Sequence, residues 1–310
     1  MRKWLSALLA VWLLLTASAC TQTSSLPDST QQQGITFTDA LGRAVTVDHP
    51  VRVGIASGSF AECWQLAGGS AAAVTQDALD DSRLVFSEET VSLGSLKEPS
   101  LEAILAAQLD FLILLPSLKS HLALDEALSK ANVPHAYLEV ESFEHYLSTL
   151  KLFTDITQRE DLYEKNGTQV ALEIDALLAQ PKPEPAPRVL LLRASGGKIT
   201  ARNSDSMAGK MLKELGCSNI ADQKSGLLED LSLEVISQED PDFILAVPMG
   251  EEDEAQAQLD ELLSSNPLWA KLTAVRQNRV YLLDKELFHY KPNARWGESY
   301  ETLAAIFQSQ

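Results

Sequence analysis

Cysteine is scarce in this 310-residue chain, which contains only Cys20, Cys63 and Cys217. Cys63 and Cys217 lie far apart in the sequence, and we expect them to be buried small side chains in different halves of the chain, without a bridge between them. No CxxC motif or Cys/His cluster indicates a structural metal site, and the scattered histidines do not suggest a multi-histidine cage.

Positive charge is also in short supply. The chain has 25 Lys and Arg residues against 43 Asp and Glu residues, a formal net charge of −18. Such a surface repels phosphate backbones, so we expect no nucleic-acid partner. It does not exclude an anionic ligand, because a local basic cluster can override the global field.

Recognisable catalytic motifs are missing as well. The sequence contains no G-x-S-x-G, H-E-x-x-H or Walker loop. It also lacks the internal repeats expected of a surface adhesin. Because the catalytic motifs are missing, we expect a protein that is not an enzyme.

The first twenty residues predict export. Arg2 and Lys3 precede an apolar stretch over Trp4–Leu15 that is too short to span a bilayer comfortably, and small residues follow directly before Cys20. This layout predicts a signal peptide over 1–19 and resembles a bacterial lipobox, in which the Cys20 thiol is acylated and becomes the mature N-terminus.

Two further points concern this end of the chain. Ala17 stands where a lipobox usually has Leu, so an ordinary signal peptide with an incidental Cys20 is the alternative. Residues 20–34 are polar and lack periodicity, which indicates a flexible tether between the membrane and a globular body. No later segment is long and apolar enough to cross a membrane.

The body alternates apolar strand-like runs with helical patterns, which is typical of α/β proteins with parallel sheets. Its length of about 275 residues exceeds the usual single core, so we expect two lobes. We place an N-terminal α/β lobe at 35–142, connecting helices at 143–180 and a C-terminal α/β lobe at 181–310. The connecting region has no strand pattern and includes a long helix with Gly167 inside it.

Several runs carry a resemblance to a known family: Phe37–Val47, Pro50–Val53, Gly94–Ile104, Leu109–Ile113, Asp240–Ile244 and Tyr290–Tyr300. They resemble the helical-backbone (class III) solute-binding lipoproteins of ABC importers for ferric siderophores, haem and vitamin B12. The resemblance covers essentially all of Ile35–Gln310. It implies two Rossmann-like lobes joined by a long helix, with a ligand cleft between them that closes to a limited extent.

The resemblance also implies a function. The chain is expected to be a lipid-anchored monomer on the extracytoplasmic face of the cell membrane. It would capture an iron complex, without a resident cofactor or a directly bound metal, and deliver it to an ABC permease dimer. Haem and a cobalamin are alternative ligands in the same class. An enzyme on a two-lobed, metallocluster-like scaffold is the alternative from another class.

The family docks on its permease through one Glu on each lobe, and the matching positions are Glu102 and Glu234. Each follows Ser-Leu at the start of a short predicted helix. The alternative is that each carboxylate only interacts favourably with the helix dipole. The repetition of Ser-Leu-Glu in both lobes favours docking.

Ligand contacts are expected in loops at the carboxyl ends of strands, as in other open α/β sheets. The predicted ligand-binding residues are Ser57, Gly58, Ser59, Phe60, Arg193, Lys198, Arg202, Met249, His289, Tyr290, Arg295 and Trp296, with Asp77, Lys97, Pro116 and Ser117 as weaker candidates. Gly58 permits a close approach of the backbone to a ligand, or it is needed only for the local turn.

The basic members of this set, together with Lys291, suit the oxygen atoms of an anionic ferric complex. Each base alone also fits a solvated surface position. His289 or Tyr290 would suit haem iron as an axial ligand, or would be a packed pair. Trp64 and Trp296 would stack on a planar ligand or lie in the core.

The lipid anchor is directly testable. We expect Cys20→Ala to release the protein into the medium or to leave it unprocessed, because the thiol that would carry the lipid is gone. Membrane fractionation and intact-mass measurement check this. A Cys20→Ala protein that is processed and membrane-associated like its parent contradicts the prediction.

Overall fold

The computed structural model describes residues 34–195 and 197–308. The predicted signal peptide, almost all of the tether, and Cys20 lie outside the described residues. The first strand of the described chain begins at Ile35. Cys63 and Cys217 are both free, as expected, and burial raises the pKa of the Cys217 thiol to about 12.

The N-terminal lobe is built on a five-stranded parallel sheet in the order β5-β4-β3-β8-β9. Its strands are β3 (Val53–Ile55), β4 (Ala71–Val74), β5 (Val91–Ser92), β8 (Phe111–Leu114) and β9 (His135–Tyr137). The central strands β3 and β8 are buried along their whole length. This is why they read in the sequence as unbroken apolar runs.

Short helices and two hairpins surround this sheet. The helices are α1 (Gly58–Leu66), α2 (Gln76–Leu79), α3 (Leu101–Ala106), α4 (Lys119–Leu122) and α5 (Asp125–Lys130). The hairpins pair β1 (Ile35–Thr38) with β2 (Ala44–Val47), and β6 (Gly94–Ser95) with β7 (Glu98–Pro99).

The sequence predicts one helix over His121–Ala131, whereas the structure has two, α4 and α5. The break has a tertiary cause. The Tyr137 hydroxyl donates a hydrogen bond of 2.9 Å to the His121 carbonyl, which an unbroken helix would use for the Asp125 amide.

The connecting region consists of helices and has no strand, with a break at Gln158 and Arg159. It contains α6 (Phe143–Thr157), α7 (Glu160–Tyr163), a π-helical turn (Glu164–Thr168) and α8 (Gln169–Leu178). Gly167 lies inside the π turn, where a Cβ atom would come within 3.2 to 3.3 Å of the Leu150, Leu147 and Tyr163 side chains. The glycine therefore permits close packing of the connecting helices and does not end the helix.

The C-terminal lobe has a mixed sheet in the order β11-β10-β13-β14, with β12 also paired to β10. Its strands are β10 (Arg188–Ser195), β11 (Lys198–Ala201), β12 (Ser218–Asn219), β13 (Phe243–Met249) and β14 (Val280–Leu282). β10 and β13 are parallel. The antiparallel β10–β11 hairpin was not predicted; Gly197, at φ +80°, permits its tight turn.

The helices of this lobe are α9 (Met207–Glu214), α10 (Ile220–Gln223), α11 (Leu233–Glu239), α12 (Glu252–Ser264), α13 (Thr273–Arg276), α14 (Lys285–Phe288) and α15 (Trp296–Gln308). Short 3₁₀ turns occupy Ser225–Leu228, Trp269–Lys271 and Asn293–Arg295.

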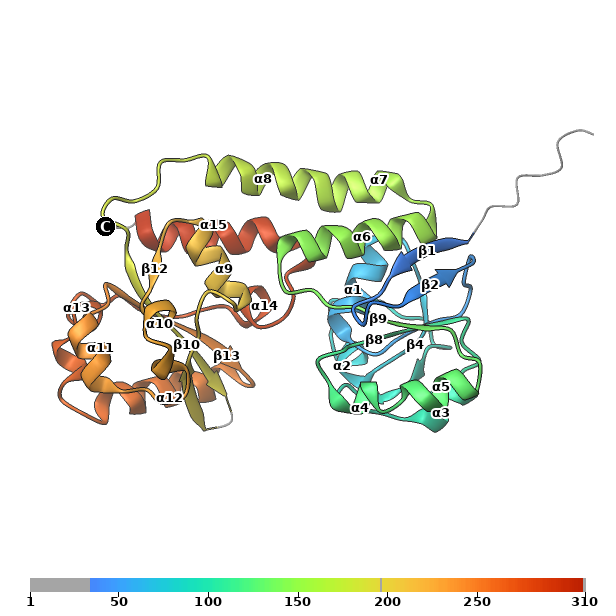
Figure 1. Ribbon diagram of the computed structural model, residues 1–310, viewed down its shortest axis with the longest axis horizontal. Helices are drawn as coiled ribbons and strands as arrows, with labels where there is room; N and C mark the ends of the chain where they lie inside the picture. Colours follow the sequence, from blue (N-terminus) through green and yellow to red (C-terminus); the bar gives the residue numbers. More distant parts are fainter. Residues whose placement is uncertain (1–33, 196, 309–310) are drawn as a thin grey trace, which may run out of the picture. The chain divides into compact units, whose positions relative to one another are not determined.

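The last helix, α15, returns to the connecting region and runs alongside α8 (Figure 1). Val170 and Ile174 of α8 belong to the same buried apolar cluster as Trp296 and Leu303 of α15. This cluster also contains core side chains of both sheets, so one continuous apolar core extends through both lobes. None of the described helices is long and apolar enough to cross a membrane.

Candidate functional site

Three adjoining cavities are lined by residues of both lobes, and we refer to them together as the cleft. The middle cavity, of about 350 Å³, shares Leu96, Leu115 and Lys291 with a basic cavity of about 450 Å³. It shares Ser59 and Asp77 with an acidic cavity of about 400 Å³. The three therefore lie side by side, with different chemistry at the two ends of the row.

The basic cavity contains two arginines placed by the β10–β11 hairpin. Arg193 lies near the carboxyl end of β10, and its Nε donates to the Met249 sulfur on β13. Arg202 follows β11, and its backbone N–H donates to the Leu191 carbonyl of β10 at 2.8 Å. The pKa of Arg193 is lowered by burial and by the neighbouring Arg202 charge. Two guanidinium groups are thus held beside one cavity.

Lys291 and His289 complete this wall from the segment after α14. Burial lowers the pKa of the Lys291 ammonium, and nearby Lys210 lowers it further, while Glu141 and Glu139 act in the opposite sense. Burial, together with the charges of Arg193 and two lysines, lowers the pKa of His289 to about 4. Its imidazole is therefore neutral at physiological pH.

The electrostatic character of this wall depends on whether its basic side chains form ion pairs. Within the described part of the chain, Arg193, Arg202 and Lys291 form no ion pair with a carboxylate. No Asp or Glu lines the basic cavity. Lys291 also lies near Glu139 and Glu141, which line the middle cavity, so the two arginines are the cations without a nearby carboxylate. Two half-buried guanidinium groups of this kind make the basic cavity a favourable place for an anion.

The wall from the N-terminal lobe is built around the start of α1. Ser57 is the N-cap residue, and Gly58 donates its backbone N–H to Asp77 Oδ2 at 2.7 Å. Ser59 and the buried Phe60 line the middle cavity. This wall therefore combines small polar groups, one aromatic ring and a carboxylate.

A buried histidine holds two of the lining leucines in place. His121 Nδ1 accepts a hydrogen bond of 3.1 Å from the Leu115 N–H, so its Nε2 carries the proton and donates to the Leu96 carbonyl at 2.7 Å. Both leucines line the cleft. Burial lowers the pKa of His121, which keeps this neutral tautomer.

An asparagine connects the two lobes at the cleft. Asn293 is 2% exposed and has φ of +52°, a left-handed conformation that asparagine tolerates. Its Nδ2 donates to the Ser59 carbonyl and to Glu62 Oε2, both at 2.9 Å. The segment that carries His289 and Lys291 is thereby fixed against α1.

Most of the predicted ligand-binding residues line the cleft: Ser57, Gly58, Ser59, Phe60, Arg193, Arg202, His289 and Tyr290. The weaker candidates Asp77 and Ser117 also line it. Tyr290 is 39% exposed, and the Lys285 ammonium lies 5.4 Å from its ring centroid.

Four predicted ligand-binding residues have other surroundings. Lys198 is exposed at the tip of the β10–β11 hairpin, and Met249 lies behind Arg193. Arg295 pairs with Glu286 and Glu298, both at 2.7 Å. Trp296 is 1% exposed and packs on Phe143 in the core. None of these four lines the cleft.

Sequence reasoning missed several lining residues. Leu138–Glu141 follow β9, and Leu115 follows β8. The same rule of carboxyl strand ends that selected Ser57 and Arg193 would have found both. Leu96 and Met207 have no such position, and nothing in the sequence pattern indicates them.

The two candidate docking residues occupy matching positions. Glu102 lies in the first turn of α3 and Glu234 in the first turn of α11, and both are exposed. In each helix the serine two residues earlier is the N-cap, and its hydroxyl accepts a backbone N–H. Among the described residues neither carboxylate has an ion-pair partner.

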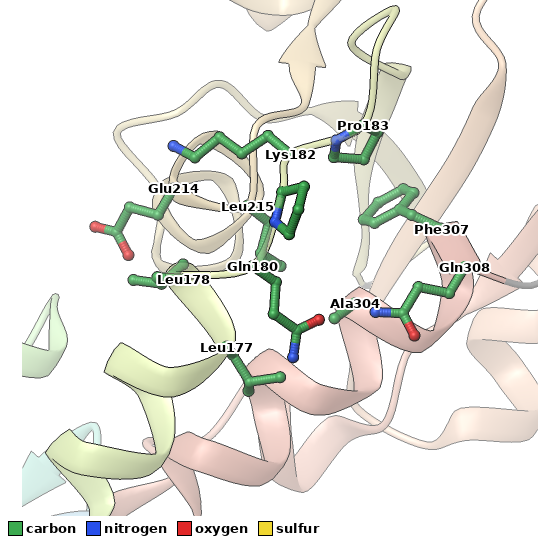
Figure 2. Close-up of a pocket in the computed structure, with 11 residues that line it drawn as sticks. Leu177, Leu178, Gln180, Lys182, Pro183, Glu214, Leu215, Ala304, Phe307 and Gln308 are labelled. Carbon is green, nitrogen blue, oxygen red and sulfur yellow. The ribbon is translucent and has the colours of Figure 1, made fainter.

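A separate cavity lies at the end of α8 (Figure 2). Its volume is about 70 Å³, and residues such as Leu177, Lys182, Leu215 and Phe307 line it. It is too small for a metal chelate and shares no residue with the cleft. In the described parts of the chain, no group of three or more His, Cys, Asp or Glu side chains is placed to hold a metal ion.

Residues 56–287 match the family model of the periplasmic binding proteins. The Fe(3+)-citrate-binding protein YfmC of Bacillus subtilis is 26% identical over 80% of this chain and 78% of its own length. YhfQ of the same organism, a candidate ABC transporter substrate-binding lipoprotein, is 23% identical over 93% of this chain and 92% of its own length.

Solved structures show the same fold. The haem-binding protein HutB of Vibrio cholerae has a TM-score of 0.68 at 20% identity, over 84% of this chain and 99% of HutB. The catecholate-siderophore-binding protein VctP of the same organism has a TM-score of 0.66 at 18% identity, over 90% of this chain and 100% of VctP. The expected fold of two α/β lobes is therefore confirmed.

The neutral state of His289 predicts a pH dependence of stability. The folded chain holds the pKa of this ring near 4, below the usual value of about 6.5. Between these values the unfolded chain binds a proton that the folded chain does not bind, so the free energy of unfolding falls as pH falls. The slope for one proton is at most about 1.4 kcal/mol per pH unit.

We expect His289→Gln to lose part of this dependence. Urea unfolding at pH 7.5, 6.0 and 5.0 measures it. A variant whose free energy of unfolding falls as steeply as that of the parent over this range contradicts the assignment.

Proposed function

The chain belongs to the family of periplasmic binding proteins, and we propose that it captures an anionic ferric complex and delivers it to the permease of an ABC importer. Members of this family are solute-binding proteins, which are not enzymes. They bind small molecules and work together with a membrane permease. The iron complex is cargo in this proposal, and the chain acts as a monomer.

The unpaired cations of the cleft carry the proposal. Arg193, Arg202 and Lys291 line one cavity that has no carboxylate in its wall, although the chain as a whole has a net charge of −18. The two arginines have no ion-pair partner in the described residues, whereas Lys291 also lies near Glu139 and Glu141 of the middle cavity. A half-buried cation without a partner is unfavourable unless a ligand supplies the opposite charge. Planar guanidinium groups form paired hydrogen bonds with carboxylate or catecholate oxygens.

The names of two relatives support iron as the metal of the ligand. YfmC is named for Fe(3+)-citrate and VctP for catecholate siderophores, and both ligands are bulky anions with oxygen donors. A cleft of three adjoining cavities, each of about 350 to 450 Å³, offers space for such a complex.

Haem is the second candidate, favoured by one specific observation. The His289 ring lines two cavities of the cleft, is neutral, and forms no hydrogen bond through its ring nitrogens within the described residues. A neutral imidazole is an axial ligand for haem iron, and the cations would then meet the propionates. A haem titration that shifts the Soret band, with the shift lost in His289→Ala, would favour this candidate.

The role of the arginines is testable. We expect Arg193→Ala and Arg202→Ala each to weaken ferric citrate or ferric catecholate binding by about tenfold to a hundredfold, the equivalent of about 1.5–3 kcal/mol for a hydrogen bond to a charged group. Binding should also weaken as salt is raised, because part of the attraction is long-range. Tryptophan fluorescence titration at low and high salt measures both effects.

Lys198→Ala is the matched control, since it removes one positive charge outside the cleft. It should bind within about twofold of the parent. Unchanged affinity in the two cleft variants, with no salt dependence, would show that apolar contacts hold the ligand and would favour haem or a cobalamin.

The place of action is also part of the proposal. We place the mature protein on the extracytoplasmic face of the membrane, anchored through a lipid on Cys20. The lipobox-like sequence supports this, as does the naming of YhfQ as a lipoprotein. The Cys20→Ala experiment above tests the anchor.

Docking on the permease is assigned to Glu102 and Glu234. We expect the double variant Glu102→Ala/Glu234→Ala to bind its ligand as tightly as the parent and to lose transport and ligand-stimulated ATPase activity. Both carboxylates are exposed, lie on different lobes and have no ion-pair partner in the described residues, so a charged pocket of a partner can reach them.

Glu88→Ala/Glu254→Ala is the control, because it removes two equally exposed carboxylates, one from each lobe. Reconstituted transport and solution affinity are measured side by side. A Glu102→Ala/Glu234→Ala protein that supports transport at the rate of the control overturns the docking assignment.

A further inference from the structure

The cleft has opposite charges at its two ends. Arg193, Arg202 and Lys291 line the basic cavity, and no carboxylate does. The acidic cavity is lined by Gly58, Ser59, Asp77, Asp80, Asp81, Ser82, Arg83, Glu286 and Tyr290. Its one cation, Arg83, is already paired, because it lies 2.6 Å from Asp81 and 3.7 Å from Glu286.

The helix start in this region would otherwise attract an anion. α1 has nine residues, and its first amide, that of Gly58, borders the cleft. Free N–H groups and the helix dipole make such an end a natural anion-binding site. In this chain Asp77 Oδ2 accepts a hydrogen bond of 2.7 Å from the Gly58 N–H. A carboxylate of the protein itself therefore takes the place of a ligand oxyanion.

The local geometry fits this contact closely. A Cβ atom at residue 58 would lie 3.1 Å from Asp77 Oδ2, so a larger residue would crowd the carboxylate. The second oxygen, Asp77 Oδ1, is buried and has no hydrogen-bond partner among the described residues. Asp77 lines both the acidic and the middle cavity. It therefore places a carboxylate, already bonded to the start of α1, at the boundary between these two cavities.

We infer that Asp77 is a specificity-determining residue that excludes anionic groups from the N-terminal wall and thereby orients the ligand. This inference rests on the proposed function. The anionic groups of the complex face Arg193 and Arg202, and its edge of hydrogen-bond donors, such as hydroxyl, amide or ammonium groups, faces Asp77. The preferred ligand is a ferric chelate with its negative charge on one side.

A symmetrical polyanion is the informative probe for this arrangement. Ferric citrate places negative charge on all sides, so part of it must approach Asp77 when it occupies the cleft. We expect Asp77→Asn to bind ferric citrate more tightly than the parent, by about threefold to tenfold, the range expected for removing one like charge at a half-open site. The asparagine retains an oxygen that accepts the Gly58 amide, so the local fold is preserved.

Asp80→Asn is the matched control. It removes one charge from the same cavity, but Asp80 is exposed and its carboxylate accepts a hydrogen bond from Gln76 of α2, not from the start of α1. Its ferric citrate affinity should stay within about twofold of the parent, since exposed charges are screened. An Asp77→Asn protein that binds ferric citrate no more tightly than Asp80→Asn overturns the inference.

A second measurement does not depend on iron. Iron-free citrate is titrated into the parent and into Asp77→Ala while the Gly58 amide is followed by NMR. We expect the Gly58 resonance to shift only in Asp77→Ala, where the helix start is free to accept the anion. An equal shift in the parent, or no shift in the variant, contradicts the exclusion of anions by Asp77.

The two measurements separate the possible failures. If no ferric complex binds the parent but citrate reaches Gly58 only in Asp77→Ala, the proposed iron cargo is wrong and the role of Asp77 stands. If ferric complexes bind and neither Asp77 variant differs from its control, the proposed function stands and the orienting role is wrong.

Discussion

The placement of unpaired positive charge in a half-buried cleft is the constraint on which the rest of the molecule depends. Arg193 and Lys291 lose hydration, and Arg193 and Arg202 form no ion pair with a carboxylate in the described parts of their own chain. That arrangement lowers the stability of the empty protein and is tolerated because the surrounding fold is rigid. The free energy given up in this way returns when a ligand supplies the negative charge.

Rigidity comes from elements that are buried on both sides. β10 and β13 pair in parallel over seven residues, from Val189 with Phe243 to Ser195 with Met249, and the carboxyl end of this pair holds Arg193. Arg202 is tied back to β10 through its own backbone. On the other lobe, His121 fixes two lining leucines with one neutral ring. The walls of the cleft are thus held by backbone pairing and buried hydrogen bonds.

The relation between the lobes has a similar basis. The core cluster shared by α8 and α15 is continuous with the cores of both sheets, and Asn293 connects the two walls at the cleft itself. The π turn with Gly167 allows the connecting helices to approach closely. These contacts agree with a limited change of shape on binding, because a large rotation would separate the Asn293 amide from Ser59 and Glu62.

The sequence predicted the lobes, the connecting helices and most strands, because fully buried parallel strands produce apolar runs such as Phe111–Leu114 and Phe243–Val247. It did not predict the β10–β11 hairpin, since Lys198–Ala201 is too short and too polar to stand out. The prediction of a single helix over His121–Ala131 was wrong for a tertiary reason. The Tyr137 hydroxyl, from β9, donates a hydrogen bond to the His121 carbonyl.

The cleft was predictable to the extent that it follows strand ends. Ser57–Phe60, Arg193 and Arg202 come directly after or at the ends of strands, whereas Leu96 and Met207 reach the cleft through tertiary packing alone. The sequence does not distinguish Arg295 from Arg193, because both are basic residues near a predicted loop. In the structure Arg295 pairs with Glu286 and Glu298, whereas Arg193 has no such partner. Pairing is a property of the folded chain, and it decides which basic residue is available to a ligand.

The net charge of −18 and the local basic wall act over different distances. In salt of physiological strength the Debye length is about 8 Å, so acidic groups elsewhere on the surface are largely screened at the cleft. The three cations lie within that distance of any ligand that fills the basic cavity, and they act through a partly desolvated medium in which charges interact more strongly. The local attraction therefore dominates binding, while the acidic surface mainly affects how often an anion arrives. Asp77 and its neighbours lie within the same short range, which is why the orientation of a bound anion depends on them and not on the remaining acidic residues.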